Sequence, residues 1–104
     1  MAEDYRSSGP LCLILLDYVE PLDAVDVQMG AHVEWLKKGF GEGVFLIAGR
    51  KDPRTGGVIV VRGTKDRVEA LARTDPFVES GVATAEVIAF NASFAVPEIA
   101  ALLA

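Results

Sequence analysis

The sequence contains one histidine, one cysteine and one tryptophan, and it has no long apolar segment. The single cysteine, Cys12, excludes a disulfide within the chain and indicates a reducing, cytoplasmic setting. The longest apolar run, Leu11 to Leu16, is much shorter than the roughly 20 residues that span a bilayer. Residues 1–10 also lack the basic start and apolar stretch of a secretion signal. We therefore predict a cytoplasmic protein with no membrane partner.

Basic side chains are scarce as well, since 10 lysines and arginines face 15 acidic residues and the net charge is −5. Nucleic-acid backbones require clustered basic residues, so nucleic acid is not an expected partner. One histidine and one cysteine cannot build a structural zinc site, and no carboxylate–histidine cluster has ligand spacing. The sequence has neither a nucleophile motif nor a phosphate-binding loop in the right context. It therefore predicts a site without metal or cofactor.

Apolar residues, in contrast, are abundant enough for one core. They make up 51% of the 104 residues, whereas charged residues make up 24%. A chain of this length forms one domain that buries roughly 65% of its unfolded surface. We expect residues 1–10 to be a flexible N-terminal tail and residues 11–104 to form the single domain.

Hydrophobic periodicity predicts alternating strands and helices. Continuous apolar runs indicate strands whose two faces are both covered, while apolar residues at a spacing of three to four indicate amphipathic helices. Asp23 and Thr64 are expected to cap the two longer helices, and Gly81 to end a short one. The predicted elements are a strand from residue 11, a helix over 25–40, strands over 44–49 and 58–61, a helix over 65–73, a short helix from 76, a strand over 82–94 and a tail helix over 97–104 packed by its Ile and Leu residues.

This order is β-α-β-β-α-β, the arrangement of ferredoxin-like α+β folds with a four-stranded antiparallel sheet. Both helices of such a fold cover one face of the sheet and leave the other face bare. The first and third strands are apolar on both sides, so a monomer would expose a large hydrophobic surface. We therefore expect a homodimer whose two sheets pack through their open faces into a barrel-like core.

Two residues suit acid–base chemistry. His32 lies at the edge of the apolar face of its predicted helix. The residues alone favour a core-edge histidine that donates to a backbone carbonyl over a catalytic one. Asp75 directly precedes Pro76, which is a strong helix-start signal, and a capping role explains it without any chemistry.

Three further side chains have open interpretations. Arg50 ends a strand beside a turn and can bind an anionic substrate group. A solvated arginine near Asp52 is the simpler interpretation of this residue. Tyr18 ends the first strand and can line the same substrate cavity as Arg50. Glu86 is either a buried partner or an edge residue that faces water.

Several segments together resemble the YciI-like (YCII-related) family of small proteins over nearly all of residues 11–94. They are the apolar first strand ending near Asp17-Tyr18, the helix with Ala31-His32-Val33-Glu34-Trp35-Leu36, the run Gly43-Val44-Phe45-Leu46-Ile47-Ala48-Gly49, the turn Pro53-Arg54-Thr55-Gly56-Gly57, and Asp75-Pro76-Phe77.

This resemblance implies a dimeric α+β barrel related in shape to muconolactone isomerases. It also implies an active site built around a histidine and an aspartate, here His32 and Asp75. Some members resemble dehydrochlorinases that act on chlorinated hydroxyquinols in aromatic compound degradation. This chain has Gly49-Arg50 where the family usually has Gly-Pro, which alters the lip of the pocket.

Taken together, the residues and the resemblance predict a cofactor-free lyase or isomerase, of dehydrochlorinase type, for a small molecule with a hydroxylated ring or a lactone. His32 would transfer the proton and Asp75 would orient it, while Arg50 and Tyr18 would bind the substrate. Two alternatives remain open: a non-catalytic dimeric module that binds small molecules, and a cofactor-free monooxygenase on the same barrel.

Overall fold

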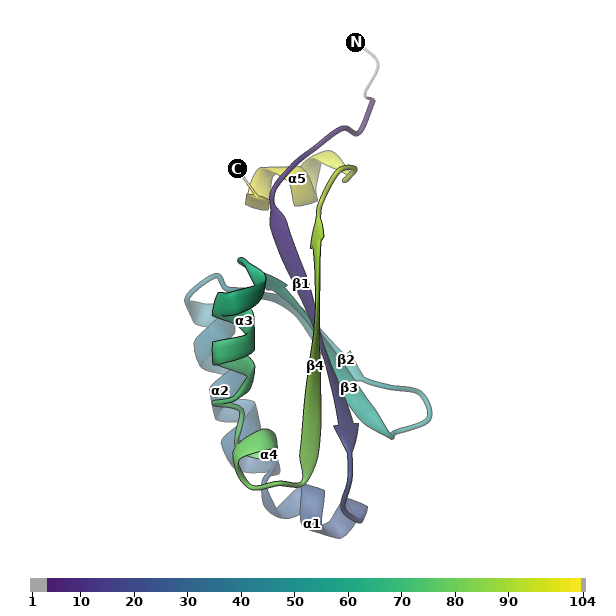
Figure 1. Ribbon diagram of the computed structural model, residues 1–104, viewed down its shortest axis with the longest axis vertical. Coiled ribbons are helices and arrows are strands. Elements are labelled where there is room, and N and C mark those ends of the chain that lie inside the picture. Colours follow the sequence, from purple (N-terminus) through teal and green to yellow (C-terminus); the bar gives the residue numbers. More distant parts are fainter. Residues whose placement is uncertain (1–3, 104) are drawn as a thin grey trace.

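The computed structural model describes residues 4–103. Four strands form an antiparallel sheet in the order β2-β3-β1-β4, with helices α2 and α3 on one side of it (Figure 1). The predicted α+β class and βαββαβ order are confirmed. The elements are β1 (Pro10–Tyr18), α1 (Leu22–Val27), α2 (Met29–Gly41), β2 (Phe45–Arg50), β3 (Gly56–Arg62), α3 (Lys65–Ala72), α4 (Pro76–Glu79), β4 (Ala83–Asn91) and α5 (Pro97–Leu103).

The helix predicted over residues 25–40 is in fact two helices that meet at Gln28. The Gln28 N–H donates to the carbonyl of Val25, three residues back, and this tight turn closes α1. The side chain of Val25 is fully buried, whereas α2 runs along the sheet in a new direction (Figure 1). The periodicity is nearly continuous through the junction, so it did not reveal the break.

The predicted caps were partly wrong. Asp23 lies in the first turn of α1, after the N-cap residue Pro21. Thr64 does precede α3, but its side chain makes no capping hydrogen bond. Asp75 caps α4 as expected, and Gly81 follows that helix with a φ of 82°. Such a positive φ favours glycine because glycine has no Cβ.

The two ends of the described chain lie together, beyond the helix layer (Figure 1). Residues 1–3 of the predicted tail lie outside the described residues; further along, Arg6 forms an isolated bridge with Phe94. Helix α5 follows this pairing but buries none of its residues, and Leu102 is 46% exposed. The expected tail helix is therefore present, but its packing is only partial, because Ile99 and Leu103 are half-buried while α5 projects past the sheet and not onto the core.

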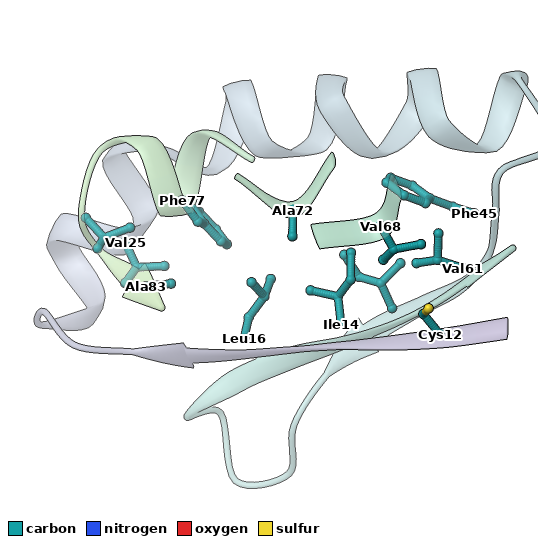
Figure 2. Close-up of a cluster of buried hydrophobic side chains, with 12 residues drawn as sticks. Cys12, Ile14, Leu16, Val25, Phe45, Val61, Val68, Ala72, Phe77 and Ala83 are labelled. Atoms are coloured by element: carbon teal, nitrogen blue, oxygen red, sulfur yellow. The ribbon is translucent and has the colours of Figure 1, made fainter. Parts of the chain in front are cut away.

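Twelve buried hydrophobic residues form the core between the sheet and the helices (Figure 2). One face of β1 supplies Cys12, Ile14 and Leu16, each at most 2% exposed. Within residues 4–103, the longest helix is α2, with 13 residues, and no helix is both long and apolar enough to cross a bilayer.

Gly39 lies inside α2 because Phe45 occupies the space where a side chain would be. A Cβ at position 39 would lie 2.1 Å from the Phe45 ring, so Gly39→Ala is expected to lower the free energy of unfolding by about 1–3 kcal/mol. Gly30 is the matched control, because nothing lies within 4 Å of a Cβ there and alanine is the better helix former. Gly30→Ala should raise stability by up to about 1 kcal/mol. Urea denaturation of the two variants measures whether the unfolding free energy falls for Gly39→Ala and rises for Gly30→Ala.

The opposite face of the sheet carries an apolar row across all four strands. Leu13 pairs with Val60 on one side and with Ile88 on the other, and Val60 pairs with Ile47. Residues opposite one another in an antiparallel pair share a face. Ile47 is 60% exposed and Ile88 is 42% exposed, so this face is uncovered in the single chain.

Candidate functional site

Asp75 is fixed at the junction between α3 and α4. It is the N-cap of α4, and its Oδ1 accepts a hydrogen bond from the Phe77 backbone N–H at 3.0 Å. Pro76 occupies the first helical position, where its missing N–H leaves no bond unmade. The Asp75 side chain is completely buried. The local sequence Asp-Pro-Phe therefore places a carboxylate rigidly inside the protein.

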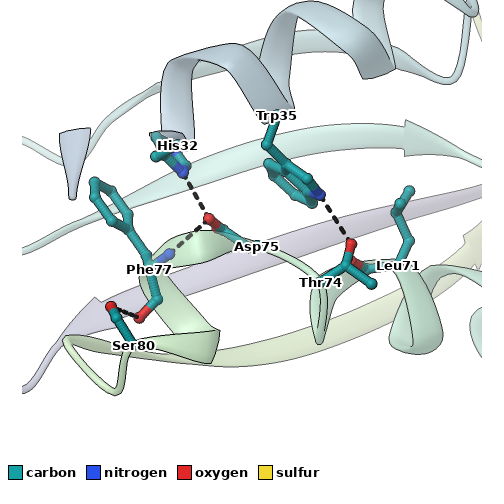
Figure 3. Close-up of polar contacts among 7 residues, drawn as sticks. All are labelled: His32, Trp35, Leu71, Thr74, Asp75, Phe77 and Ser80. Carbon is teal, nitrogen blue, oxygen red and sulfur yellow. Dashed lines mark hydrogen bonds and ion pairs between the residues drawn. The ribbon is translucent and has the colours of Figure 1, made fainter. Parts of the chain in front are cut away.

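His32 projects from α2 toward this carboxylate (Figure 3). Its Nδ1 lies 2.8 Å from Asp75 Oδ1, and the histidine is only 8% exposed. The same carboxylate oxygen accepts from both His32 and Phe77. The other oxygen, Oδ2, is buried and has no hydrogen-bond partner among the described residues.

Two aromatic rings hold the imidazole from either side. The Phe77 ring stacks on it with centroids 3.9 Å apart and an interplanar angle of 6°. The Trp35 ring lies at 5.9 Å and 28°. Trp35 Nε1 donates to Thr74 Oγ1 at 2.9 Å, which ties α2 to the residue before Asp75 (Figure 3). The imidazole ring therefore has little freedom to rotate.

Sequence reasoning missed Trp35, Thr74 and Phe77 as residues that position the site. The spacing of three between His32 and Trp35 did place them on one helix face. Thr74 gave no signal, because its contact with α2 joins segments 39 residues apart.

The contact with Asp75 determines how the imidazole can react. An ionised carboxylate only accepts hydrogen bonds, so with Asp75 ionised the 2.8 Å contact requires that Nδ1 of His32 carry the proton and donate it. In the neutral ring Nε2 is then the unprotonated nitrogen and can accept a proton. Within residues 4–103, Nε2 has no hydrogen-bond partner. This is the arrangement that a general base requires.

His32 lines a cavity of about 210 Å³ between α2 and one end of the sheet. Tyr18 and Arg50 line the same cavity, whereas Asp75 lies behind His32 and outside it. Ligand pockets typically measure about 300–1,000 Å³, so this cavity fits a ligand of about one ring. The lining residues are Leu16, Tyr18, Met29, His32, Val33, Leu36, Ala48, Gly49, Arg50, Gly56, Gly57, Val58, Ile59 and Phe77.

Arg50 and Glu86 are both exposed side chains at the sheet. Arg50 is exposed and, within the described chain, has no salt-bridge partner, so its expected neighbour Asp52 does not neutralise it. Glu86 is exposed on β4 opposite Leu15, which makes it a residue that faces water in the single chain. Among residues 4–103, no group of three or more His, Cys, Asp or Glu side chains is arranged to hold a metal ion.

The YCII-related domain family matches residues 11–91, which is most of the chain. The chain belongs to the YCII-related family. The match covers every strand except the first residue of β1 and includes both His32 and Asp75. The resemblance inferred from the sequence is thereby confirmed. A comparison of this sequence with curated proteins found no match.

A solved structure of a distant relative has the same fold. It is 5-chloro-2-hydroxyhydroquinone dehydrochlorinase (TftG) from Burkholderia phenoliruptrix AC1100, in complex with 2,5-dihydroxybenzoquinone. The TM-score is 0.64 at 20% sequence identity, and the match covers 75% of this chain and 90% of that one. This similarity supports the assignment of the dimeric α+β barrel fold class, and at this identity it says nothing about activity.

Proposed function

We propose that this YCII-related protein is a cofactor-free lyase or isomerase that moves a proton on a hydroxylated ring or a lactone. The observation that carries the proposal is the 2.8 Å contact between His32 Nδ1 and a fully buried carboxylate, behind a cavity that His32 itself lines. A core-edge histidine that only donates to a backbone carbonyl needs neither feature. The distant dehydrochlorinase, which binds a single-ring quinone, suggests the ring size and the reaction type.

The proposed substrate is a chlorinated hydroxyquinol. His32 Nε2 takes the proton of one ring hydroxyl, the oxygen electron pair forms a carbonyl, and His32 delivers that proton to the carbon that bears chlorine. The C–Cl bond then breaks and chloride leaves with its electron pair, while a second ring hydroxyl loses its proton and becomes a carbonyl. The products are a hydroxyquinone and HCl, so no external oxidant is consumed. Asp75 holds the imidazole ring of His32 in place and stabilises its positive charge while the imidazolium carries the proton.

Arg50 and Tyr18 are proposed to bind the substrate. Both line the cavity with His32, and the positive charge of Arg50 has no salt-bridge partner among the described residues. A guanidinium in this position can receive an ionised ring oxygen or a carboxylate in a bidentate contact.

We also propose that the functional unit is a homodimer formed through the open sheet face. The row of Ile47, Val60, Leu13 and Ile88 is the support, because an apolar face across four strands is a typical interaction surface. Packing two such faces would cover the exposed fractions of Ile47 and Ile88.

The test of the proposed activity is chloride release from 5-chloro-2-hydroxyhydroquinone under anaerobic conditions, measured by ion chromatography. We expect release above the spontaneous rate, with no oxygen requirement. Calorimetric binding of 2,5-dihydroxybenzoquinone without turnover of any hydroxyquinol or lactone would instead favour a binding module.

Asp75→Asn is expected to keep the fold and lose activity. An asparagine oxygen at the position of Oδ1 can still accept from Phe77 and His32, so unfolding free energy should fall by only about 1 kcal/mol. Asp75→Ala removes both hydrogen bonds and should cost about 2–4 kcal/mol. Because the amide has no charge to stabilise the imidazolium, chloride release by the Asn variant should drop by about 10–10²-fold. Urea denaturation and chloride assays of the two variants separate the capping role from the chemical one.

A further inference from the structure

Arg54 joins three segments next to Tyr18, which lines the cavity. It lies in the turn between β2 and β3, and its Nη2 donates to Asp26 Oδ1 on α1 at 2.6 Å. Its guanidinium carbon also lies 5.8 Å from the centroid of the Tyr18 ring, at the end of β1. A guanidinium at this distance from an aromatic ring is within the range of cation–π attraction.

Stability alone is a poor explanation of this arrangement. The Asp26 side chain is 55% exposed and that of Arg54 is 25% exposed, and an ion pair with such a solvent-exposed partner contributes little to folding. The Nε of Arg54, moreover, is buried and donates to no acceptor within residues 4–103. A buried donor without a partner is unfavourable, so such a group calls for another role.

Contacts through aromatic rings connect Arg54 to the histidine. The Tyr18 ring meets the Phe77 ring edge-on, with centroids 5.8 Å apart and an interplanar angle of 89°. Phe77 in turn stacks on His32. Tyr18 thus contacts both Arg54 and Phe77, and it also lines the cavity. The pKa of Arg54 is raised, chiefly by its hydrogen bond to Asp26 and also by Tyr18, so the guanidinium keeps its charge.

We infer that Arg54 is a positioning and specificity-determining residue of the cavity. It holds Tyr18 in the cavity wall, and its charge makes the cavity select ring ligands that carry an ionised oxygen over uncharged rings of similar shape. This inference rests on the proposed function, because it assumes that the cavity beside His32 is the ligand site. It adds Arg54 to the site, a residue that does not itself line the cavity but acts through Tyr18, which does.

The expected selectivity follows from Coulomb's law. The guanidinium carbon lies 5.8 Å from the Tyr18 ring centroid, so a ligand oxygen in contact with that ring, about 4 Å from it, would lie at most on the order of 10 Å from the charge. At that separation, in a medium between protein and water, loss of the charge should weaken binding of an anion by about fivefold to twentyfold. An uncharged ring should lose less than about twofold, because Tyr18 retains its contact with Phe77.

The experiment compares two probes by calorimetry in the full chain. One is 2,5-dihydroxybenzoquinone, whose hydroxyls ionise readily, and the other is 2,5-dimethoxybenzoquinone, which cannot ionise. Arg54→Gln should weaken the binding of the first probe by about fivefold to twentyfold and leave the affinity for the second nearly unchanged. Asp26→Asn breaks the same ion pair but keeps the Arg54 charge and removes the neighbouring negative charge, so its affinity for the anion should rise. Arg54→Lys should recover part of the lost affinity.

Salt supplies an independent readout, since screening at 1 M shortens the Debye length to about 3 Å and should shrink the effect of Arg54→Gln on the anion. Equal losses in Arg54→Gln and Asp26→Asn would mean that the ion pair merely holds the turn, and would overturn the inference. A wild type that binds both probes equally overturns the inference while leaving the proposed function in place. A wild type that binds neither probe contradicts both.

Discussion

His32→Asn is expected to reduce chloride release from 5-chloro-2-hydroxyhydroquinone by about 10²–10⁴-fold, the usual contribution of a general acid–base. The reason is that asparagine has no counterpart of Nε2, the nitrogen proposed to carry the proton. Its amide nitrogen can take the place of Nδ1 and still donate to Asp75 Oδ1, which His32 contacts at 2.8 Å. Thermal unfolding should therefore remain cooperative, and the loss should appear in kcat.

His32→Gln is the matched control for the geometry. Its amide reaches toward the position of Nε2, so the buried carboxylate of Asp75 loses its side-chain partner and keeps only the Phe77 N–H, and the variant should be less stable than His32→Asn. Both variants should be equally inactive although their stabilities differ. Chloride release by His32→Asn at the wild-type rate would contradict a catalytic role for the imidazole.

Val60→Glu is expected to convert the proposed dimer into a monomer. Val60 lies in the middle of the apolar row, between Leu13 and Ile47, so a glutamate there would bury its charge at the centre of two packed sheets. Burying an unpaired charge is strongly unfavourable, and dissociation avoids it. Light scattering should give twice the chain mass of 11.1 kDa for the wild type and the single mass for the variant.

Val27→Glu controls for the change in composition. Val27 ends α1, is 78% exposed and is not on the sheet, so the same substitution should leave the dimer mass unchanged. Circular dichroism would verify that Val60→Glu still folds. A wild type that is monomeric at micromolar concentration would refute the dimer directly.

Much of the fold could be predicted from the sequence because the strands are long apolar runs with clear turn residues between them. The Asp75-Pro76 start and the Gly81 end of α4 are local signals that tertiary packing did not override. The break at Gln28 is different. It depends on where Val25 packs in the core, and packing is not encoded in a helical repeat.

The site could be predicted only in part, and mainly through the family resemblance. His32 and Asp75 are 43 residues apart, and the residues alone favoured a structural role for each. Tyr18 and Arg50 were named from their positions at strand ends, and both line the cavity. Arg54 appeared only as part of a turn. Its contacts with Asp26 and Tyr18 join distant segments, and no spacing along the chain reports such contacts.

The most direct test of the proposed chemistry is the tautomer of the imidazole. Because His32 is the only histidine, nitrogen NMR of uniformly ¹⁵N-labelled protein above the histidine titration gives its two ring signals without assignment of the rest. We predict a protonated Nδ1 and an unprotonated Nε2, and a shift of the Nε2 signal when 2,5-dihydroxybenzoquinone is added. A protonated Nε2 with a bare Nδ1 would mean that Asp75 does not accept from this ring, and would contradict the proposed proton transfer.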